Sequence, residues 1–441
     1  MQLNKAKFIS VVGLGRLGAS FAVVLASCGL KIIGVDINQE RIKMLKKGKI
    51  DLYENSAQEL FDKHKKNLVF TDNFKDAILN TDTTFIVVPT PSNRNHSFSL
   101  NYILDVCKKI ASLLRRKTSW HLVVITSTIN PKDMDSHIRP LLEKISGKKV
   151  EKDFGLCYSP EFIALGSVVD NLTHPDFILI GESDFKSGNQ LAKLRLHICK
   201  NNPPVVRMNF VNAELTKLAL NTYITTKISF ANMLARICER LPNTDVDVVT
   251  STLGLDSRIG LKYLKGAIGY GGPCFPRDNK ALVAMLRKLK LDIKIPQTID
   301  VFNQNQTDEL INIIKKSNDK RLIIGILGLS YKPDTDVVEE SQGILFAKKL
   351  VKNNYEVVVF DPVAINNAHS ILKDSVKYAQ SVPDCIDQSD ILVIITPWKE
   401  FYNVGTYLLS RKKPLVVIDC WRMLKIKNNR IIHIPLGIYT V

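Results

Sequence analysis

Residues 8–36 decide the fold, and they read FISVVGLGRLGASFAVVLASCGLKIIGVD. The apolar run at 8–12 predicts a short strand, and the three glycines at 13–18 predict a tight turn that opens a helix. A second apolar run at 31–35 leads to Asp36. A strand, a glycine turn, a helix and a second strand ending in an acid form the dinucleotide-binding fingerprint. The stretch therefore predicts a Rossmann-like domain.

The same stretch indicates which dinucleotide binds. Glycines allow the backbone to approach a pyrophosphate, and the N-terminus of the following helix supplies partial positive charge. A carboxylate at the end of the second strand accepts hydrogen bonds from a ribose 2′-hydroxyl, which favours NAD over NADP. We therefore expect NAD as the cofactor. The expected contacts are Gly13, Leu14, Gly15, Arg16, Leu17, Gly18 and Asp36.

Two polar turns follow further strands of the expected parallel sheet. Apolar runs at 84–88 and 122–126 each end near a threonine, Thr90 and Thr128. Ligands of open α/β sheets lie beyond the carboxyl ends of the strands, so both threonines either face the cofactor or cap their turns. Glu161 follows the next strand after a proline, where it is either a surface carboxylate or part of the site.

A long helix is expected at 212–241, with Asn212 as its N-cap and Pro242 after its end. Lys217 and Asn221 are one turn apart and share a face of this helix. Their neighbours are mainly apolar, so the polar pair is either solvated or directed into a site.

One cysteine lies in a stretch unlike the others, because residues 266–278 read GAIGYGGPCFPRD. We expect a loop here, in which glycines let the backbone approach a ligand and prolines stiffen the turn. Cys274 could add to a carbonyl carbon as a thiolate, and Arg277 is the kind of neighbour that lowers a thiol pKa. A structural role is the usual case for a cysteine, so residue type alone leaves both interpretations open.

The last third of the chain repeats the plan of the first. Strands are expected at 322–327, 356–360, 391–395 and 415–418, with a helix at 341–352. The full glycine fingerprint is missing, since Ser330 and Tyr331 follow Gly328. The pattern predicts a second doubly wound sheet with a different phosphorylated ligand, and Lys332 is a candidate phosphate contact.

Length and composition limit the remaining possibilities. A chain of 441 residues predicts two or three domains, and no apolar run reaches the roughly 18 residues that span a bilayer. We expect no signal peptide, no membrane association and no metal. The eight cysteines are scattered, as in a cytoplasmic protein. The net charge of +18 comes from dispersed lysines, as at 41–49 and 63–66, so we expect solvated faces rather than nucleic-acid binding.

Taken together, these motifs resemble the UDP-glucose/GDP-mannose dehydrogenase family over nearly the whole chain. The resemblance rests on GLGRLG at 13–18, PTP at 89–91, ST at 127–128, PEF at 160–162, AELTK at 213–217 with Asn221 and KISF at 227–230, GYGGPCFPRD at 269–278, GLSYKP at 328–333, and SD at 389–390 through Trp398. It implies an α/β fold with two doubly wound Rossmann-like parallel-sheet domains joined by a long central helix. The implied domains are an NAD-binding domain at 1–211, a central helical dimerisation domain with the cysteine loop at 212–317, and a nucleotide-sugar-binding domain at 318–441.

The resemblance also implies a reaction: oxidation of a sugar C6 alcohol to the carboxylate with reduction of two NAD. Cys274 would carry the substrate first as a thiohemiacetal and then as a thioester. Lys217 and Asn221 would stabilise the oxyanion, while Asp278, Glu161 and Thr128 would position or deprotonate water.

Further contacts and a partner follow from the resemblance. Cofactor contacts would also include Arg41, Pro89, Thr90, Thr128, Glu161 and Arg277. The nucleotide sugar would be held by Phe162, Ile163, Ala164, Leu165, Lys217, Asn221, Tyr263, Gly269, Tyr270, Gly271, Tyr331, Lys332 and Arg422. Arg258 would reach the sugar site of a second subunit, so we expect a homodimer joined along the long helix.

Several departures from the family pattern bear on these expectations. Arg277 and Leu165 stand where relatives commonly have lysine and glutamate, and Pro273 replaces a frequent serine. Glu339 stands where relatives usually have an arginine near the cofactor. An active enzyme is still expected, with UDP-glucose or a UDP-N-acetylhexosamine as its substrate. The alternatives are a two-electron hydroxyacid-type dehydrogenase and a catalytically silent nucleotide-sugar-binding protein.

Overall fold

The structure, a computed structural model, describes residues 8–50, 55–316, 322–411, 413–426 and 428–440. It divides into two compact units, Met1–Ala219 and Leu220–Val441, and the boundary falls inside the long helix α9 (Phe210–Cys238). The division into three domains stays a prediction, and its boundary at 317 and 318 lies outside the described residues. None of the helices described is both long and apolar enough to cross a membrane.

The first unit is built on an eight-stranded sheet with the order β3-β2-β1-β4-β5-β6-β7-β8. All neighbours are parallel except β6 and β7. The strand order reverses at β1, as in a doubly wound sheet, which confirms the predicted fold class. The strands are β1 Phe8–Val12, β2 Lys31–Val35, β3 Leu68–Thr71, β4 Thr83–Ile86, β5 Leu122–Ile125, β6 Gly155–Tyr158, β7 Ile178–Glu182 and β8 Val205–Met208.

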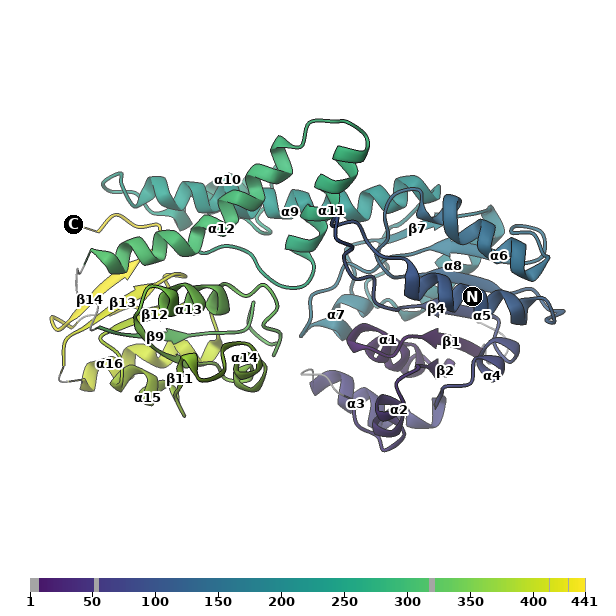
Figure 1. Cartoon of the computed structure of the whole chain (residues 1–441), viewed down its shortest axis with the longest axis horizontal. Coiled ribbons are helices and arrows are strands. Elements are labelled where there is room, and N and C mark those ends of the chain that lie inside the picture. The colour runs from purple at the N-terminus through teal and green to yellow at the C-terminus, as the bar shows by residue number, and fades with distance from the viewer. Residues whose placement is uncertain (1–7, 51–54, 317–321, 412, 427, 441) are drawn as a thin grey trace. The chain divides into compact units, whose positions relative to one another are not determined.

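Helices cover both faces of this sheet, because its strands are apolar on both sides. One core contains side chains of α1, α2, α3, α7 and α8, and the other contains side chains of α4, α5, α6 and the start of α9. Figure 1 shows α1 and α5 among the helices packed around the strands of this unit. The helices are α1 Arg16–Ser27, α2 Gln39–Lys46, α3 Asn55–His64, α4 Phe74–Leu79, α5 Asn101–Leu114, α6 Arg139–Ser146, α7 Val168–Thr173 and α8 Phe185–Ile198, with a 3-10 helix at Lys65–Asn67 and a π-helix, η2, at Met134–Ile138.

The second unit contains a parallel sheet with the order β11-β10-β9-β12-β13-β14, so its strands follow the same winding as β3-β2-β1-β4-β5-β6. The predicted repetition of the first part is therefore confirmed. The strands are β9 Ile323–Leu327, β10 Glu356–Phe360, β11 Lys377–Tyr378, β12 Ile391–Ile394, β13 Leu415–Asp419 and β14 Ile431–Pro435.

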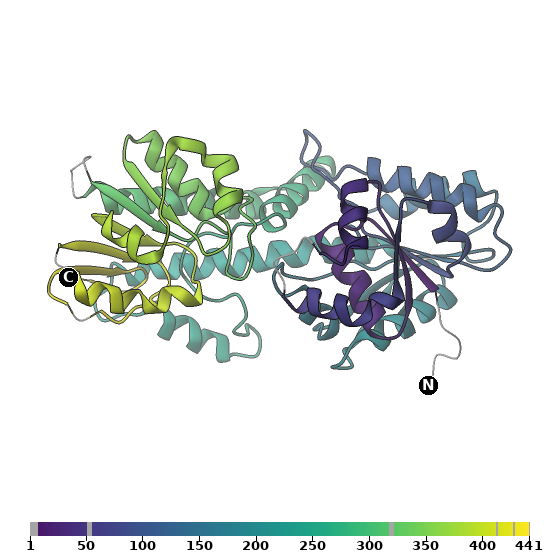
Figure 2. The same ribbon diagram turned by 90° about the horizontal axis from the view of Figure 1, so that it is seen from below.

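Helices again cover both faces of the second sheet. Figure 1 shows α12 and α13 on one side and α15 and α16 on the other, and Figure 2 shows the second sheet and its helices from a perpendicular direction. The rest of α9 and two shorter helices complete the unit. Besides α9, the helices are α10 Val246–Leu255, α11 Phe275–Lys288, α12 Lys294–Lys315, α13 Gln342–Lys352, α14 Ile365–Leu372, α15 Val382–Asp387 and α16 Val404–Ser410, with 3-10 helices at Lys373–Ser375 and Lys399–Asn403.

The start of the long helix differs from the sequence prediction. Helix α9 begins at Phe210, so the predicted N-cap Asn212 lies inside its first turn. Asn209 Oδ1 accepts a hydrogen bond from the Asn212 backbone N–H at 2.9 Å. An asparagine side chain that accepts from a first-turn N–H is the geometry of an N-cap, so Asn209 replaces Asn212 in this role.

Candidate active site

The glycine turn of the first unit has the shape that a dinucleotide needs. Gly13 has φ +93°, and a Cβ added there would lie 2.6 Å from the Val87 carbonyl oxygen. A Cβ added at Gly18 would lie 1.8 Å from the Gly13 carbonyl oxygen, whereas one at Gly15 meets nothing within 4 Å. Gly13 and Gly18 therefore permit close packing, and Gly15 leaves the approach to the N-terminus of α1 open for a pyrophosphate.

Asp36 holds this turn from the end of β2. Its carboxylate accepts hydrogen bonds from the backbone N–H groups of Leu14 at 2.7 Å and Asn38 at 2.9 Å. The Arg41 guanidinium lies 3.5 Å from the same carboxylate. Asp36 is thus oriented before any ribose arrives, which fits the predicted role in binding NAD.

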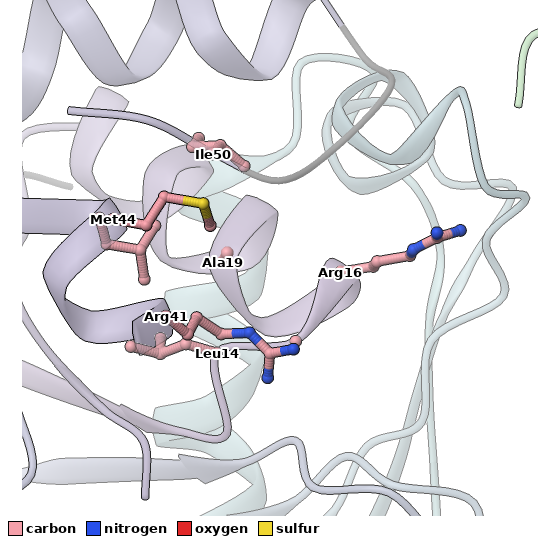
Figure 3. Close-up of a pocket in the computed structure, with 8 residues that line it drawn as sticks. Leu14, Arg16, Ala19, Arg41, Met44 and Ile50 are labelled. Carbon is pink, nitrogen blue, oxygen red and sulfur yellow. The ribbon is translucent and has the colours of Figure 1, made fainter. Parts of the chain in front are cut away.

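A hollow beside the turn is lined by Leu14, Gly15, Arg16, Ala19, Arg41, Met44, Leu45 and Ile50. Figure 3 shows the Arg41 side chain extended beside Leu14, while Arg16 points away from the other lining residues. The apolar wall and the flanking guanidinium suit a flat ring with an attached ribose, so the residues present fit a dinucleotide.

The two threonine turns lie at the same edge of the sheet as the glycine turn. Strand β4 pairs with both β1 and β5, and all three are parallel, so their carboxyl ends meet there. Thr90 is buried, Pro89 is exposed and Thr128 is half-buried. Their predicted contacts with the cofactor stay predictions.

Glu161 does not lie on the surface, because it is only 8 % exposed. Its carboxylate accepts two hydrogen bonds from the guanidinium of Arg195, one of them at 2.9 Å from Nη2. Its backbone carbonyl oxygen accepts from Lys217 Nζ at 2.7 Å. In this geometry the carboxylate is bound to a buried arginine, and the backbone carbonyl of Glu161 positions Lys217. The expected action of the Glu161 carboxylate on water stays a prediction.

Arg195 was not among the predicted site residues, although its spacing carries a signal. Leu191, Leu194 and Ile198 are buried on α8, and Arg195 falls on the same helical face. A charged residue within an apolar face indicates a buried ion pair.

Lys217 and Asn221 are both buried, which excludes the solvated interpretation for this pair. In the first unit, Lys217 Nζ lies 4.6 Å from the centre of the Phe162 ring, a cation–π contact. In the second unit, Asn221 Nδ2 donates to Asp278 Oδ2 at 2.6 Å. Arg277 donates to the other oxygen of Asp278 at 3.3 Å, so donors surround this carboxylate on both sides.

The cysteine stretch is less of a loop than its composition predicts. Cys274 is the N-cap residue of α11, and Pro276, Arg277 and Asp278 lie in the first turn of that helix. The Asp278 N–H donates to the Cys274 carbonyl oxygen at 2.8 Å, which closes the first helical turn. Negative charge at a helix N-terminus is stabilised by the helix dipole, so the position suits a thiolate.

Among the eight cysteines, all within the described residues, Cys274 alone is exposed. Burial raises the pKa of the Cys107 and Cys385 thiols to about 12. Buried thiols of this kind are inert. Exposure therefore distinguishes Cys274 from the others in a way that the sequence cannot.

The glycines of the cysteine stretch serve packing within the protein. A Cβ added at Gly269 would lie 2.6 Å from Asn303 Oδ1, one at Gly271 would lie 2.4 Å from the Glu340 carbonyl oxygen, and one at Gly272 would lie 2.6 Å from the Tyr331 ring. The expected approach of this backbone to a ligand stays a prediction, and the glycines have a packing role in addition. They let α12 and the segment at 331–340 approach the backbone that leads to Cys274.

Tyr270 also holds this backbone, and its predicted contact with the substrate stays a prediction. Tyr270 is 5 % exposed, and its hydroxyl donates to Asp300 Oδ1 at 2.7 Å. Its carbonyl oxygen accepts from Asn303 Nδ2 at 3.0 Å and Gln342 Nε2 at 2.9 Å. Asn232 clamps the preceding residues in the same way. Sequence reasoning missed these amide side chains because their partners are distant in the chain.

The remaining predicted substrate residues fall into four groups. Phe162, Ile163, Ala164 and Leu165 are half-buried and follow β6. In the second unit, Arg258 and Tyr263 are exposed, while Tyr331 and Lys332 lie on the segment that packs against the cysteine stretch. Arg422 is different, because it donates to both oxygens of Asp247 and to the carbonyl oxygens of Gly266 and Leu436. This bonding gives Arg422 a structural role, and its contact with the substrate stays a prediction.

Comparison with known proteins agrees with this geometry. Three models of one family match the chain: the "UDP-glucose/GDP-mannose dehydrogenase family, NAD binding domain" at 7–198, the "central domain" at 211–305 and the "UDP binding domain" at 325–426. The UDP-glucose 6-dehydrogenase of Haloferax volcanii is 33% identical over 93% of this chain and 95% of its own length. The GDP-mannose 6-dehydrogenase of Pseudomonas aeruginosa is 30% identical over 92% of this chain and 95% of its own length.

Solved structures show the same fold. A UDP-glucose dehydrogenase from Pyrobaculum islandicum superposes with a TM-score of 0.88 at 30% identity, over 98% of this chain and 99% of that one. A UDP-D-ManNAc dehydrogenase from Pyrococcus horikoshii superposes with a TM-score of 0.83 at 25% identity, over the same shares.

Proposed function

Because the chain belongs to the UDP-glucose/GDP-mannose dehydrogenase family, and is therefore an NAD-dependent nucleotide-sugar 6-dehydrogenase, we propose a specific substrate and mechanism. The enzyme oxidises the C6 alcohol of a UDP-linked hexose or N-acetylhexosamine to the carboxylate, with Cys274 as the covalent carrier. The observation that carries this proposal is the exposed thiol at the N-terminus of α11, next to the paired Asp278 and Asn221.

The proposed reaction balances over two oxidations. NAD, when bound, accepts a hydride in each of them. Loss of hydride and a proton turns the C6 alcohol into an aldehyde, to which the Cys274 thiolate adds to form a thiohemiacetal. Loss of a second hydride and a proton leaves a thioester. Water then adds to the thioester carbonyl, and the thiolate leaves to release the carboxylic acid.

The protein's own groups assist each of these steps in the proposal. The Lys217 ammonium and the Asn221 amide donate hydrogen bonds to the oxyanion that forms at C6. Asp278, held by Asn221 and Arg277, takes up the proton of the attacking water. Arg195 fixes Glu161, whose carbonyl oxygen in turn fixes Lys217.

We also propose a UDP-linked substrate rather than a GDP-linked one. The model that matches residues 325–426 is described as a UDP binding domain. The similar proteins named above are dehydrogenases of UDP-glucose, UDP-D-ManNAc and GDP-mannose, and the proposal takes the two UDP-linked classes as candidates.

A homodimer along α9 completes the proposal. In the second unit this helix exposes Tyr223, Phe230 and Ile237, which recur at a two-turn spacing and so form one apolar stripe. Phe230→Glu is expected to yield monomers in sedimentation analysis. Tyr402→Glu changes an exposed aromatic elsewhere in the unit and should leave the assembly unchanged. A wild-type protein that sediments as a monomer contradicts the dimer.

A substrate panel tests the proposed reaction. The purified enzyme is mixed with NAD and UDP-glucose, UDP-N-acetylhexosamines or GDP-mannose, and NADH formation and product mass are followed. The proposal predicts a uronate from a UDP sugar. A stable aldehyde with one NADH would indicate a two-electron dehydrogenase, and binding without turnover of any sugar would indicate a silent relative.

A further inference from the structure

Glu214 is a buried carboxylate that none of the steps above uses. It lies on α9 one turn before Lys217 and is 0 % exposed. Within the part of the chain that the structure describes, its carboxylate forms no ion pair. Instead, Oε2 accepts a hydrogen bond from the Lys132 N–H at 2.7 Å, and Oε1 accepts from the Met134 N–H at 2.8 Å. The two bonds join the start of α9 to the segment that follows β5.

That segment carries Thr128 and has an unusual backbone. Lys132 adopts φ +78°, a left-handed conformation that side chains other than glycine rarely take. The π-helix η2 follows directly at Met134–Ile138, and π-helices are frequent at functional sites. Asn130 anchors the same turn to Asp133 and to Phe98. The backbone after Thr128 is therefore strained, and the side chains around it hold it in place.

We propose that Glu214 is a positioning residue for sugar oxidation, which holds the turn carrying Thr128 in a fixed geometry relative to the helical turn carrying Lys217. The proposal rests on the role proposed above for Lys217 and on the role towards water that the family resemblance implies for Thr128. A carboxylate at this place satisfies two backbone N–H groups, of which that of Met134 would otherwise be buried without a partner. Charge-assisted bonds of this kind are stronger than neutral ones, so they also oppose relaxation of Lys132.

The charge of Glu214 depends on pH in the neutral range. Burial, together with the charges of Asp133 and Asp135, raises its pKa to about 7, against the lowering effect of the Met134 and Lys132 N–H groups. His137 lies 3.4 Å from Asp133 and belongs to the same cluster. The ionised carboxylate accepts both bonds, whereas protonation converts one oxygen into a donor. The turn is therefore held most firmly above pH 7.

Glu214→Gln tests the role in the reaction, because the amide keeps the shape but can accept at only one of its two terminal atoms. We expect kcat to fall about tenfold to a hundredfold through misplacement of the turn, while KM for NAD changes less than about twofold. Wild-type kcat should rise with pH through about 7, and this rise should be absent from Glu214→Gln. Glu143→Gln is the matched control, since Glu143 also accepts from a backbone N–H, that of Val150 at 3.1 Å, but is remote from α9 in the chain.

Amide hydrogen exchange gives a second readout that does not depend on turnover. Exchange at 130–136 should be faster in Glu214→Gln than in the wild type and the Glu143→Gln control. If Glu214→Gln does not fold, the Lys132 and Met134 amide resonances of the wild type should still titrate together near pH 7, and constant resonances would overturn the proposal. Unchanged exchange, or an unchanged pH profile, would also overturn it. A wild type without turnover of any nucleotide sugar would refute the proposed function instead, and the exchange data would still decide whether Glu214 holds the turn.

Discussion

The glycine turn after β1 and the glycine turn after β9 share one framework but differ in what fills them. Gly13 and Gly328 both have positive φ, +93° and +104°. In both turns a later glycine packs against the first one's carbonyl oxygen: an added Cβ would lie 1.8 Å away at Gly18 and 2.2 Å away at Gly343. Asp36 and Asp361, each following its second strand, accept at 2.7 Å from the backbone N–H after the first glycine.

The difference lies between the glycines, where residues 14–17 fill the first turn and residues 329–342 fill the second. In the second turn, Asp361 also accepts from the Ser330 N–H and hydroxyl and from Trp398 Nε1, and it is 1 % exposed. The longer segment then packs on the cysteine stretch, since Gly272 N–H donates to the Glu339 carbonyl oxygen at 3.0 Å. The same framework therefore leaves an open turn in the first unit and supports the backbone that leads to Cys274 in the second.

The largest expected effect concerns the packing glycine of the second turn. Gly343→Ala should lower the free energy of unfolding by about 3 kcal/mol, because its Cβ would collide with the Gly328 backbone. NADH affinity of the folded fraction should change less than about twofold, since NADH binds the other turn. Urea unfolding and NADH fluorescence titration measure the two quantities, and a specific loss of NADH affinity in a stable variant would break the comparison.

Gly15→Ala should have the opposite effect to Gly343→Ala: unchanged stability and weaker NADH binding. No atom lies within 4 Å of an added Cβ, so unfolding should be unaffected. NADH should bind about 100-fold more weakly, a change of about 2.7 kcal/mol, because the methyl group occupies the path of the pyrophosphate. Titration of NADH against the variant and the wild type decides this, and equal affinities would contradict the assignment of the open turn.

The two aspartates sharpen the comparison. Asp361→Asn should destabilise the protein by about 2 kcal/mol, because its amide nitrogen would face buried donors. Asp36→Asn should destabilise the protein less than Asp361→Asn does, since fewer backbone groups depend on Asp36. It should weaken NADH binding more, since NADH is expected to bind at the first turn. Chemical unfolding and NADH titration of both variants test this, and equal losses of stability would mean that the two turns are equally filled.

A smaller expected effect is a loss of stability at low pH that arises in the first sheet and not in the second. In the first sheet Ser10 pairs with Thr84, which bonds to His121 at 2.8 Å; the corresponding pair in the second sheet is Gly325 and Leu392. Burial, then the charge of Lys117, lowers the pKa of His121 to about 3 from 6.5. The unfolded chain therefore takes up the proton first, and stability present above pH 6.5 is lost as the pH falls towards 3.

At pH 5.5 this loss amounts to about 1.4 kcal/mol. Urea unfolding at pH 7.5 and 5.5 should show it in the wild type and show a smaller loss in His121→Gln. The same loss in both proteins would mean that His121 is not the titrating group.

The sequence predicts the framework of both turns but not their difference. Alternating glycines, apolar runs and terminal acids are local, so strands such as Phe8–Val12 and Glu356–Phe360 could be predicted to the residue. The correspondence between Gly18 of the first turn and Gly343 of the second could not be predicted. A long insertion separates Gly343 from Gly328, the first glycine of its turn.

The site residues, too, could be predicted where the signal is local and were missed where it depends on distant parts of the chain. Cys274, Lys217 and Asp278 stand out through motif and chemistry, whereas Arg195, Glu214 and Asn303 depend on partners far along the chain. Glu214 lies between the buried Phe210 and Leu218 on α9, so its place on an apolar face was the available signal.

The central claim is that Cys274 carries the sugar between two oxidations, and the ratio of NADH formed to uronate formed tests it most directly. With the preferred UDP sugar, the wild type is expected to form two NADH for each uronate, and no free aldehyde. Cys274→Ala should bind NADH normally and form no uronate. A wild type that releases aldehyde with one NADH, or a Cys274→Ala variant that still forms uronate, would contradict the account.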